Sequence, residues 1–340
     1  MSDKNDNKEN NINIKPKESE TAREKQPITT ALTTDPARLA AMKAAKKRFH
    51  RRRRLKDWGM FTGYLTPSLV GVMIFFFLPL LMILKQSFQK SSNNPQFVGL
   101  QHYEKVLSND AFIQAAKNTL TFSGIAVPLA VILALLLAIL LNSGIPAQSV
   151  FRSILLNPMM VPVASVVLIW QVFFSYNGVA NGWGFNHFFE PDKIDWLKSD
   201  YAQIVILVLF LWKNLGYNMV LFLAALNNID AEILESAMMD GAGALKRFFS
   251  IKMYFLSPTI FFVAIMSLIN SFKIFREVYL LTGDHPYPTL YMLQHFMNNA
   301  FKNLEYNKLS AGAIIMCVVM IAIVGILFFA EMKFDADVEG

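Results

Sequence analysis

Polar side chains suited to binding a hydroxyl-rich solute, such as a sugar, lie inside apolar stretches of the sequence. Lys213 stands between Trp212 and Asn214 in one such stretch, and no Asp or Glu lies within any of the six long apolar runs to neutralise it. Indole rings offer flat faces and amides offer hydrogen bonds to a bound solute. The candidate solute pathway comprises Trp170, Gln171, Trp212, Lys213, Asn214, Asn218, Asn270 and Lys273.

Helix packing is the alternative role for the same residues. Asn and Gln commonly form hydrogen bonds between membrane helices, and a lysine can reach water or backbone carbonyls. Taken as a group, the eight residues leave the two interpretations evenly balanced.

Catalytic chemistry has no recognisable basis in this sequence. The phosphate-binding pattern GxxxxGK[ST], the metalloprotease pattern HExxH and the hydrolase pattern GxSxG are all absent. The one cysteine, Cys317, excludes a disulfide framework, and the five histidines are scattered. We therefore expect no catalytic residue, no metal site and no cofactor in this chain.

The polar residues lie within long apolar runs of the sequence, six in all, that we expect to be helices. The hydrophobic composition of the chain indicates that these helices span a membrane. The chain is 54% hydrophobic and only 17% charged, with a mean hydropathy of +0.36. About 20 apolar residues in a helix cross the hydrocarbon core of a bilayer. The predicted spans are Tyr64–Leu84, Leu120–Leu141, Ile154–Phe174, Ile204–Leu226, Phe255–Phe275 and Ala311–Ala330. Prolines that should kink or interrupt them are Pro67, Pro79, Pro128, Pro158 and Pro162. The fold class is an all-α, polytopic membrane protein.

The positive charge of the chain is concentrated before the first span. Residues 1–56 hold 16 of the 32 Lys and Arg and only 7 acidic residues. Residues 1–34 are polar and should be disordered, whereas residues 35–57 should form a basic juxtamembrane helix. Its cluster, Arg51, Arg52, Arg53 and Arg54, is expected to face anionic lipid; nucleic-acid binding is the less favoured alternative.

Orientation follows from that basic segment. The positive-inside rule places it in the cytoplasm, and six spans then return the C-terminal tail, residues 333–340, to the same side. The loops after the second and fourth spans should also face inward.

The inward loop Asn227–Met253 should fold into two short helices. Asp230 can cap the first helix, Ala231–Met239, and Gly241 permits a turn before a second helix over Leu245–Phe249. Apolar side chains fall on one face of the first helix, beside Glu235: Ile233, Leu234, Ala237 and Met238. Such a face in water needs a cover, either the protein's own helices or the groove of a partner.

The same loop resembles the EAA signature of binding-protein-dependent ABC importer permeases. The matching residues are Glu235, Ser236, Ala237, Asp240, Gly241, Ala242, Phe248, Phe249, Ile251 and Pro258. Ser236 stands where alanine is usual and keeps a small side chain. Elsewhere the chain is similar to the carbohydrate branch of these permeases, the maltose and glycerol-phosphate type, from about Trp58 to Met332. The residues concerned are Phe97–Leu100, Asn118, Thr119, Phe151, Arg152, Pro158, Pro162, Trp170, Gly178, Asn181, Trp212, Lys213, Gly216, Phe272, Lys273, Phe275, Leu281–Gly283, Pro286 and Thr289.

The resemblance implies a type I ABC importer permease fold over residues 58–332, with residues 227–253 as its coupling loop. The loop would dock into a cleft on a cytoplasmic ATPase subunit, with Glu235 near a basic residue there and Gly241 making the turn. Closure of the ATPase pair would then switch the translocation path between inward and outward access.

The resemblance also implies a set of partners. They are a second homologous permease, two ATPase subunits that bind ATP and Mg, and an extracytoplasmic sugar-binding protein, assembled in the cytoplasmic membrane of a bacterium. Membrane lipid is a further partner, and nucleic acid is not. The transported solute would be a mono- or oligosaccharide or a related polyol derivative.

An ion-coupled secondary transporter or channel is the main alternative. Such proteins usually carry acidic residues inside the membrane, and none falls within the six predicted spans. A membrane enzyme is a third possible class of protein. The sequence does not support it, because none of the catalytic patterns described above is present.

Overall fold

The computed structural model describes residues 60, 62–91, 94–144, 146–188 and 192–339. The chain divides into two compact units, Met1–Phe76 and Phe77–Gly340. The predicted disordered tail, the basic helix 35–57 and the cluster Arg51–Arg54 all lie outside the described residues. In the first unit, residues 62–72 are helical through Pro67, and a π-helical turn, Met73–Phe77, crosses the boundary between the units.

Six helices in the described chain are long and apolar enough to cross a membrane, which confirms the predicted number. They are Thr62–Ser87, Asp110–Asn142, Val163–Gly182, Ala202–Asn227, Ala244–Thr282 and Tyr306–Lys333. The predicted bounds were too short for most of them, because polar residues at the ends continue the helices beyond the apolar runs.

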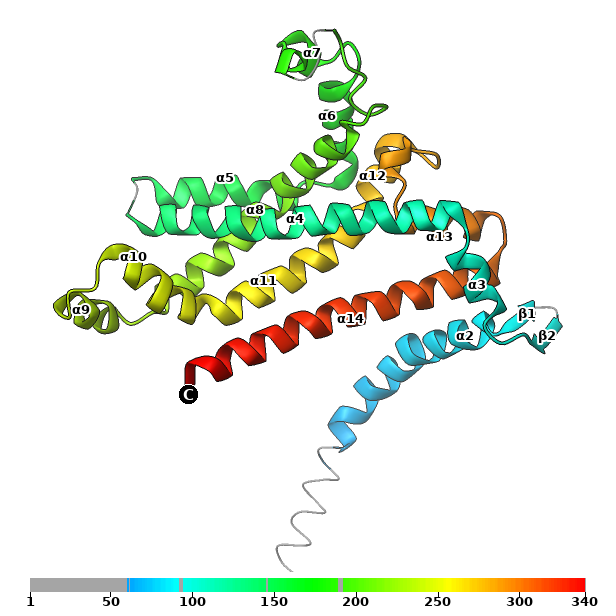
Figure 1. The fold of residues 1–340 in the computed structure, drawn as a ribbon, viewed down its shortest axis with the longest axis horizontal. Helices are drawn as coiled ribbons and strands as arrows, with labels where there is room; N and C mark the ends of the chain where they lie inside the picture. Colours follow the sequence, from blue (N-terminus) through cyan, green and yellow to red (C-terminus); the bar gives the residue numbers. More distant parts are fainter. Residues whose placement is uncertain (1–59, 61, 92–93, 145, 189–191, 340) are drawn as a thin grey trace, which may run out of the picture. The chain divides into compact units, whose positions relative to one another are not determined.

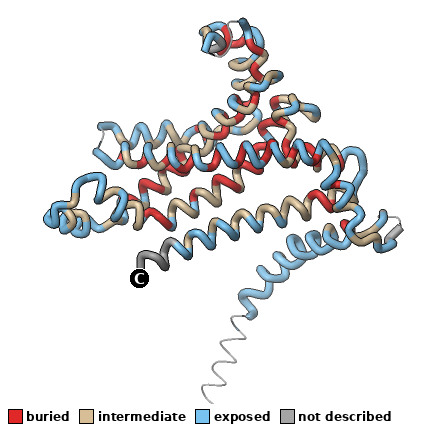
Figure 2. The backbone as a smooth tube through the Cα atoms, in the orientation of Figure 1, coloured by how far each residue is buried: buried red, intermediate tan, exposed pale blue. Residues whose placement is uncertain are grey.

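Three helices of the second unit form its centre: α4 (Asp110–Asn142), α8 (Ala202–Asn227) and α11 (Met253–Lys273). Each packs against the other two, and Figure 2 shows buried residues along them. Four alanines of α4 recur every fourth residue and are completely buried: Ala126, Ala130, Ala134 and Ala138. Small side chains at this spacing let neighbouring helices approach closely.

The long helix α14 (Tyr306–Glu339) packs on this centre and on α2 (Leu78–Ser87), which follows the π turn with Pro79 in its first turn. α14 continues through residues predicted as the C-terminal tail, as far as Glu339. Pro128 lies inside α4, whose helix continues past it.

The predicted third span, Ile154–Phe174, is wrong as a single helix. The structure forms α5 (Gln148–Met160), which contains Pro158, and then α6 (Val163–Phe174). Val161, directly before Pro162, is extended with ψ 131°, as a residue before proline prefers. The predicted interruption therefore falls at Pro162.

A glycine explains how closely α5 approaches α8. A Cβ atom added at Gly216 of α8 would lie 1.9 Å from the Leu155 carbonyl oxygen of α5. Backbone cannot yield to such a clash, so only glycine permits this contact.

Short elements complete the second unit. They are the strands β1 (Gln89–Ser91) and β2 (Asn94–Phe97), the helices α3 (Gln101–Leu107), α7 (Val179–Gly182), α9 (Ala231–Met239), α10 (Ala244–Arg247), α12 (Phe275–Thr282) and α13 (Leu293–Lys302), the 3-10 turns Phe185–Phe188 and Pro288–Leu290, and a π turn, Phe248–Lys252. The strands pair antiparallel, with Gln89 opposite Phe97 and Ser91 opposite Asn94, a hairpin that the sequence did not predict.

The two ends of the second unit carry different elements (Figure 1). The segment α9–α10 and the turn between α4 and α5 lie at one end, and α3, α13 and the hairpin lie at the other. This agrees with the prediction that the loops after the second and fourth spans share a side.

Side-chain hydrogen bonds hold the loops at the end with α13. Asn118 of α4 donates to the carbonyl oxygens of Pro288 (2.6 Å) and Tyr291 (2.9 Å), and Thr119 Oγ1 accepts from the Leu293 amide (2.9 Å). Two adjacent polar residues on one long helix therefore fix the segment that leads into α13.

Candidate functional site

A polar cavity of about 320 Å³ lies between α8, the junction of α11 and α12, and the segment joining α5 to α6. Its polar lining is supplied by Lys213, Asn214, Asn270, Lys273, Arg276 and Glu277. Four of these six are predicted pathway residues, which the fold brings together from sequence positions more than fifty residues apart. Their role in solute passage stays a prediction.

Lys213 has an acidic partner, which corrects the expectation that it would lack one. Its Nζ forms an ion pair with Glu277 Oε1, and the exposed side-chain fractions are 18% for Lys213 and 6% for Glu277. The fifth helix was predicted to end at Phe275. The chain instead passes through one turn residue, Ile274, whose φ of −60° and ψ of −16° are near-helical, and continues into α12, where Glu277 is buried. Glu277 therefore lies within a membrane-length helix, and a lack of acidic residues in the spans no longer weighs against an ion-coupled transporter.

The two asparagines of the cavity form a chain of hydrogen bonds. Asn270 Nδ2 donates to Asn214 Oδ1 (3.0 Å), and Asn214 Nδ2 donates to the Phe210 carbonyl oxygen (2.8 Å). This chain links α11 to α8 and fixes the orientation of both amides. Asn270 Oδ1 accepts no hydrogen bond from the described residues.

The remaining predicted pathway residues lie outside the cavity lining. Trp170 and Trp212 contact each other with ring centroids 5.2 Å apart, and Gln171 Nε2 is 3.4 Å from the carbonyl oxygens of Leu280 and Leu281. Asn218 is buried and donates to Ser267 Oγ at 2.9 Å. For Gln171 and Asn218 the contacts fit the alternative of helix packing.

Sequence reasoning missed Arg276 and Glu277. Both follow Phe275, the last residue of the predicted fifth span, and so fall outside it. The signal that could have found them is their place three and four residues after Lys273, on the same helical turn if the helix continues.

The segment α9–α10 has the predicted helix, turn and helix. At the end of α9, the Ala242 amide donates to the Ala237 carbonyl (2.9 Å) and the Gly241 amide donates to that of Met238 (3.0 Å). This pair of bonds is a Schellman motif, and Gly241 takes the φ of +79° that it requires. Asp230 occupies the cap position but its side chain forms no capping bond.

The surface of this segment is apolar and open. Met239 is 89% exposed, and Met238, Leu245 and Phe249 are also exposed. Glu235, Ser236, Asp240 and Gly241 are exposed, and Ala237 and Ala242 are half-buried. Pro258 is exposed inside α11, after the π turn. On the predicted apolar face of α9, Ile233 and Met238 are exposed and Leu234 and Ala237 are half-buried, so the described part of this chain covers that face only in part.

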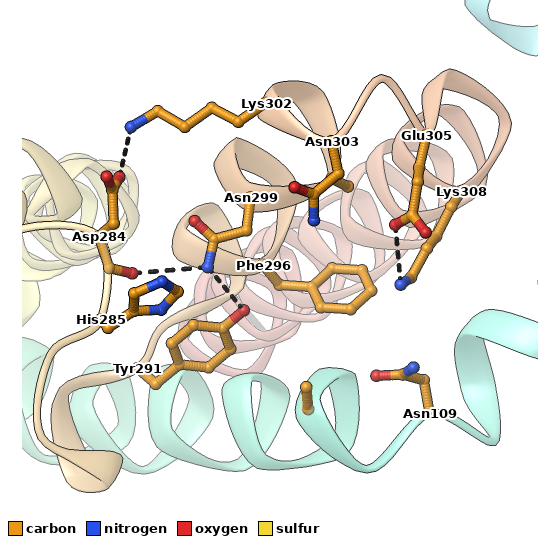
Figure 3. Close-up of a pocket in the computed structure, with 12 residues that line it drawn as sticks. Asn109, Asp284, His285, Tyr291, Phe296, Asn299, Lys302, Asn303, Glu305 and Lys308 are labelled. Carbon is orange, nitrogen blue, oxygen red and sulfur yellow. Dashed lines mark hydrogen bonds and ion pairs between the residues drawn. The ribbon is translucent and has the colours of Figure 1, made fainter.

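A second polar cavity, of about 310 Å³, lies at the end with α13 (Figure 3). Lys302 Nζ lies 2.5 Å from Asp284 Oδ1 and 2.9 Å from the Tyr279 hydroxyl. The hydrogen bond from Lys302 lowers the pKa of Asp284, and the bond to Asp284 raises the pKa of Lys302. Glu305 and Lys308 form a further ion pair at 3.0 Å. These pairs are exposed, so water screens them.

Comparison with known protein families identifies the family of this chain. Residues 126–334, more than half of the chain, match the family of inner membrane components of binding-protein-dependent transport systems. The chain belongs to this family. The matched region contains both α9–α10 and the cavity around Lys213, so the resemblance drawn from the loop is confirmed. As a permease component, the chain is the membrane part of a transport system rather than its ATPase.

Individual relatives cover most of the chain. A probable ABC transporter permease of Bacillus subtilis is 30% identical over 78% of this chain and 88% of its own length. The lactose transport system permease of Rhizobium radiobacter is 29% identical over 78% and 91%. The sn-glycerol-3-phosphate transport system permease of Agrobacterium fabrum is 29% identical over 78% and 93%.

Solved structures share the fold. The crystal structure of a bacterial ABC transporter involved in the import of the acidic polysaccharide alginate aligns with a TM-score of 0.71 at 22% identity, over 84% of this chain and 99% of that one. The predicted fold class is thereby confirmed.

Proposed function

We propose that this chain is the permease subunit of an ATP-driven importer that carries a carbohydrate, or a related polyol derivative, into the cytoplasm by alternating access. The names of its relatives support a solute of this class. The observation that carries the proposal is the continuity between the open segment α9–α10 and the two helices that line the polar cavity.

α8 ends at Asn227, just before α9, and α11 begins at Met253, just after the π turn that follows α10. Fourteen residues of α8 separate Asn227 from Lys213, a distance of about 21 Å in a helix. A rigid-body displacement of α9–α10 is therefore transmitted to Lys213 and Asn214 through α8, and to Asn270 and Lys273 through α11.

The partners follow from the open surfaces. The apolar side chains of α9–α10, with Glu235 among them, dock on a cytoplasmic ATPase subunit, and two such subunits bind the ATP and Mg. A second homologous permease completes the translocation path, and an extracytoplasmic binding protein delivers the solute. Both termini are cytoplasmic in this arrangement, in a bacterial cytoplasmic membrane, and Arg51–Arg54 contact anionic lipid.

Charge reversal on α9 tests this proposal. Glu235→Lys should abolish recovery of the ATPase with the permease and ATP-dependent uptake, while the amount of protein in the membrane stays normal. Because Glu235 is exposed, the substitution does not disturb packing. Glu305→Lys, an exposed reversal at the opposite end of the unit, is the matched control and should leave recovery of the ATPase unchanged. Normal ATPase recovery and uptake with Glu235→Lys would refute the assignment of the loop.

A further inference from the structure

The cavity around Lys213 carries more positive than negative charge. Three cationic side chains line it, Lys213, Lys273 and Arg276, against the single carboxylate of Glu277. Because Glu277 is already paired with Lys213, the cavity keeps two uncompensated positive charges.

Lys273 and Arg276 are the two cations without a partner. Neither forms an ion pair or a hydrogen bond with any residue that the structure describes, and both are exposed. They lie three residues apart, Lys273 at the end of α11 and Arg276 at the start of α12, and both line the same cavity. Like charges at this spacing repel each other, and an anion between them would remove the repulsion.

The same cavity offers acceptors for hydroxyl groups. Asn270 Oδ1 and Glu277 Oε2 accept no hydrogen bond from the described residues, and both side chains line the cavity. Hydroxyl donors of a sugar ring match these acceptors, whereas an anionic substituent matches the two free cations. The guanidinium of Arg276 can bind a carboxylate or phosphate through two parallel hydrogen bonds.

We infer that the transported solute is a carbohydrate bearing an anionic group, a carboxylate or a phosphate, and that Lys273 and Arg276 bind that group in the cavity. This inference rests on the proposed function, because it assigns the substrate class of the same cavity. Lys213 is not a ligand of the anion; its pairing with Glu277 holds α12 against α8 and so positions Arg276.

The test uses the complete importer, with its ATPase subunits and binding protein, in proteoliposomes. The probes are tetragalacturonate for a carboxylate, glucose 6-phosphate for a phosphate and galactotetraose as the neutral counterpart. We expect ATP-dependent uptake of one acidic probe, with uptake of galactotetraose at least tenfold lower. Which acidic probe is taken up distinguishes the two sources of negative charge.

Two variants locate the charge recognition. Arg276→Gln should lower uptake of the acidic probe about tenfold, and Arg276→Lys should retain more of it, because the positive charge remains without the two-bond geometry. Glu305→Gln, which removes a charge at the other end of the unit, should change nothing. Preferred uptake of galactotetraose, unaffected by Arg276→Gln, would overturn the inference while leaving the proposed function intact.

Two other results would also overturn the inference. Uptake of none of the three probes overturns the inference; the proposed function falls as well only if Glu235→Lys leaves the ATPase bound. Loss of the second permease from the purified complex with Arg276→Glu would show that Arg276 pairs with that subunit, and this also overturns the inference.

Discussion

The segment α9–α10 and the cavity around Lys213 are built in opposite ways. The segment is held by contacts between residues at most five apart, such as Ala242 with Ala237, and leaves its apolar side chains open. The cavity is held by contacts between residues 56 and 64 apart, the pairs Asn214–Asn270 and Lys213–Glu277. A locally built element can dock on another protein as a unit, whereas a cavity built across helices changes when those helices move.

Loss of one charge should lower the stability of the protein more in the cavity than in the segment α9–α10. Glu277→Ala leaves the ammonium group of Lys213 largely buried and unpaired, which should lower the free energy of unfolding by about 3–5 kcal/mol. The measurement is the amount of folded protein recovered in detergent and its melting temperature.

The matched control for that substitution removes both charges. Lys213→Met with Glu277→Leu should recover most of the lost stability, because apolar side chains of similar volume replace a buried pair at little net cost. A double variant as unstable as Glu277→Ala would contradict the assigned pairing.

His295 sharpens the comparison because it is buried outside the six membrane-length helices and forms no ion pair with a carboxylate of the described residues. Its ring contacts Phe275 with centroids 4.7 Å apart, and its Nδ1 accepts from the Met292 amide at 3.2 Å. Burial lowers the pKa of His295 to about 4, from an ordinary 6.5. The unfolded chain therefore binds a proton between pH 6.5 and 4 that the folded chain does not.

The free energy of unfolding should consequently fall by about 2–3 kcal/mol as the pH drops from 6.5 to 4. Melting temperatures measured at several pH values test this. His295→Gln should flatten the dependence, whereas His285→Gln, at an exposed position, should not. An equal slope in wild type and His295→Gln would contradict the assigned burial.

A substitution in the turn between α9 and α10 should have the smallest effect on stability. Gly241→Ala places a side chain at a φ of +79°, at a conformational cost of about 1 kcal/mol, although no atom lies within 4 Å of the added Cβ. Uptake should fall several-fold with little change in melting temperature, because the strain stays within the segment. Gly243→Ala is the control: its φ of −64° suits alanine and its surroundings are equally open.

The sequence predicted several local features, although not the hairpin of β1 and β2. The six apolar runs predicted the number of membrane-spanning helices. The helix and turn of α9–α10 were predicted from small residues, a glycine and an acidic residue at fixed spacing. The interruption at Pro162 was also predicted, but the same rule gave no interruption at Pro67, Pro128 or Pro158, which lie inside helices.

The features that the sequence did not predict depend on where helices end and on which helix faces pack together. Helix α12 lies beyond the apolar run, and its residue Glu277 pairs with Lys213, 64 positions away in the sequence. No local sequence pattern predicts that pairing. The free cation Arg276 was missed for the same reason. The close contact of Gly216 with Leu155 likewise arises only when α5 and α8 pack together.

The most direct test of the proposal that α9–α10 docks on an ATPase is purification of the chain from its native membrane in mild detergent, followed by mass spectrometry of the bound proteins. We predict recovery of an ATPase and a second six-span permease, with the ATPase lost on Glu235→Lys. Recovery of the chain alone, or only with copies of itself, would contradict the claim that α9–α10 couples it to an ATPase.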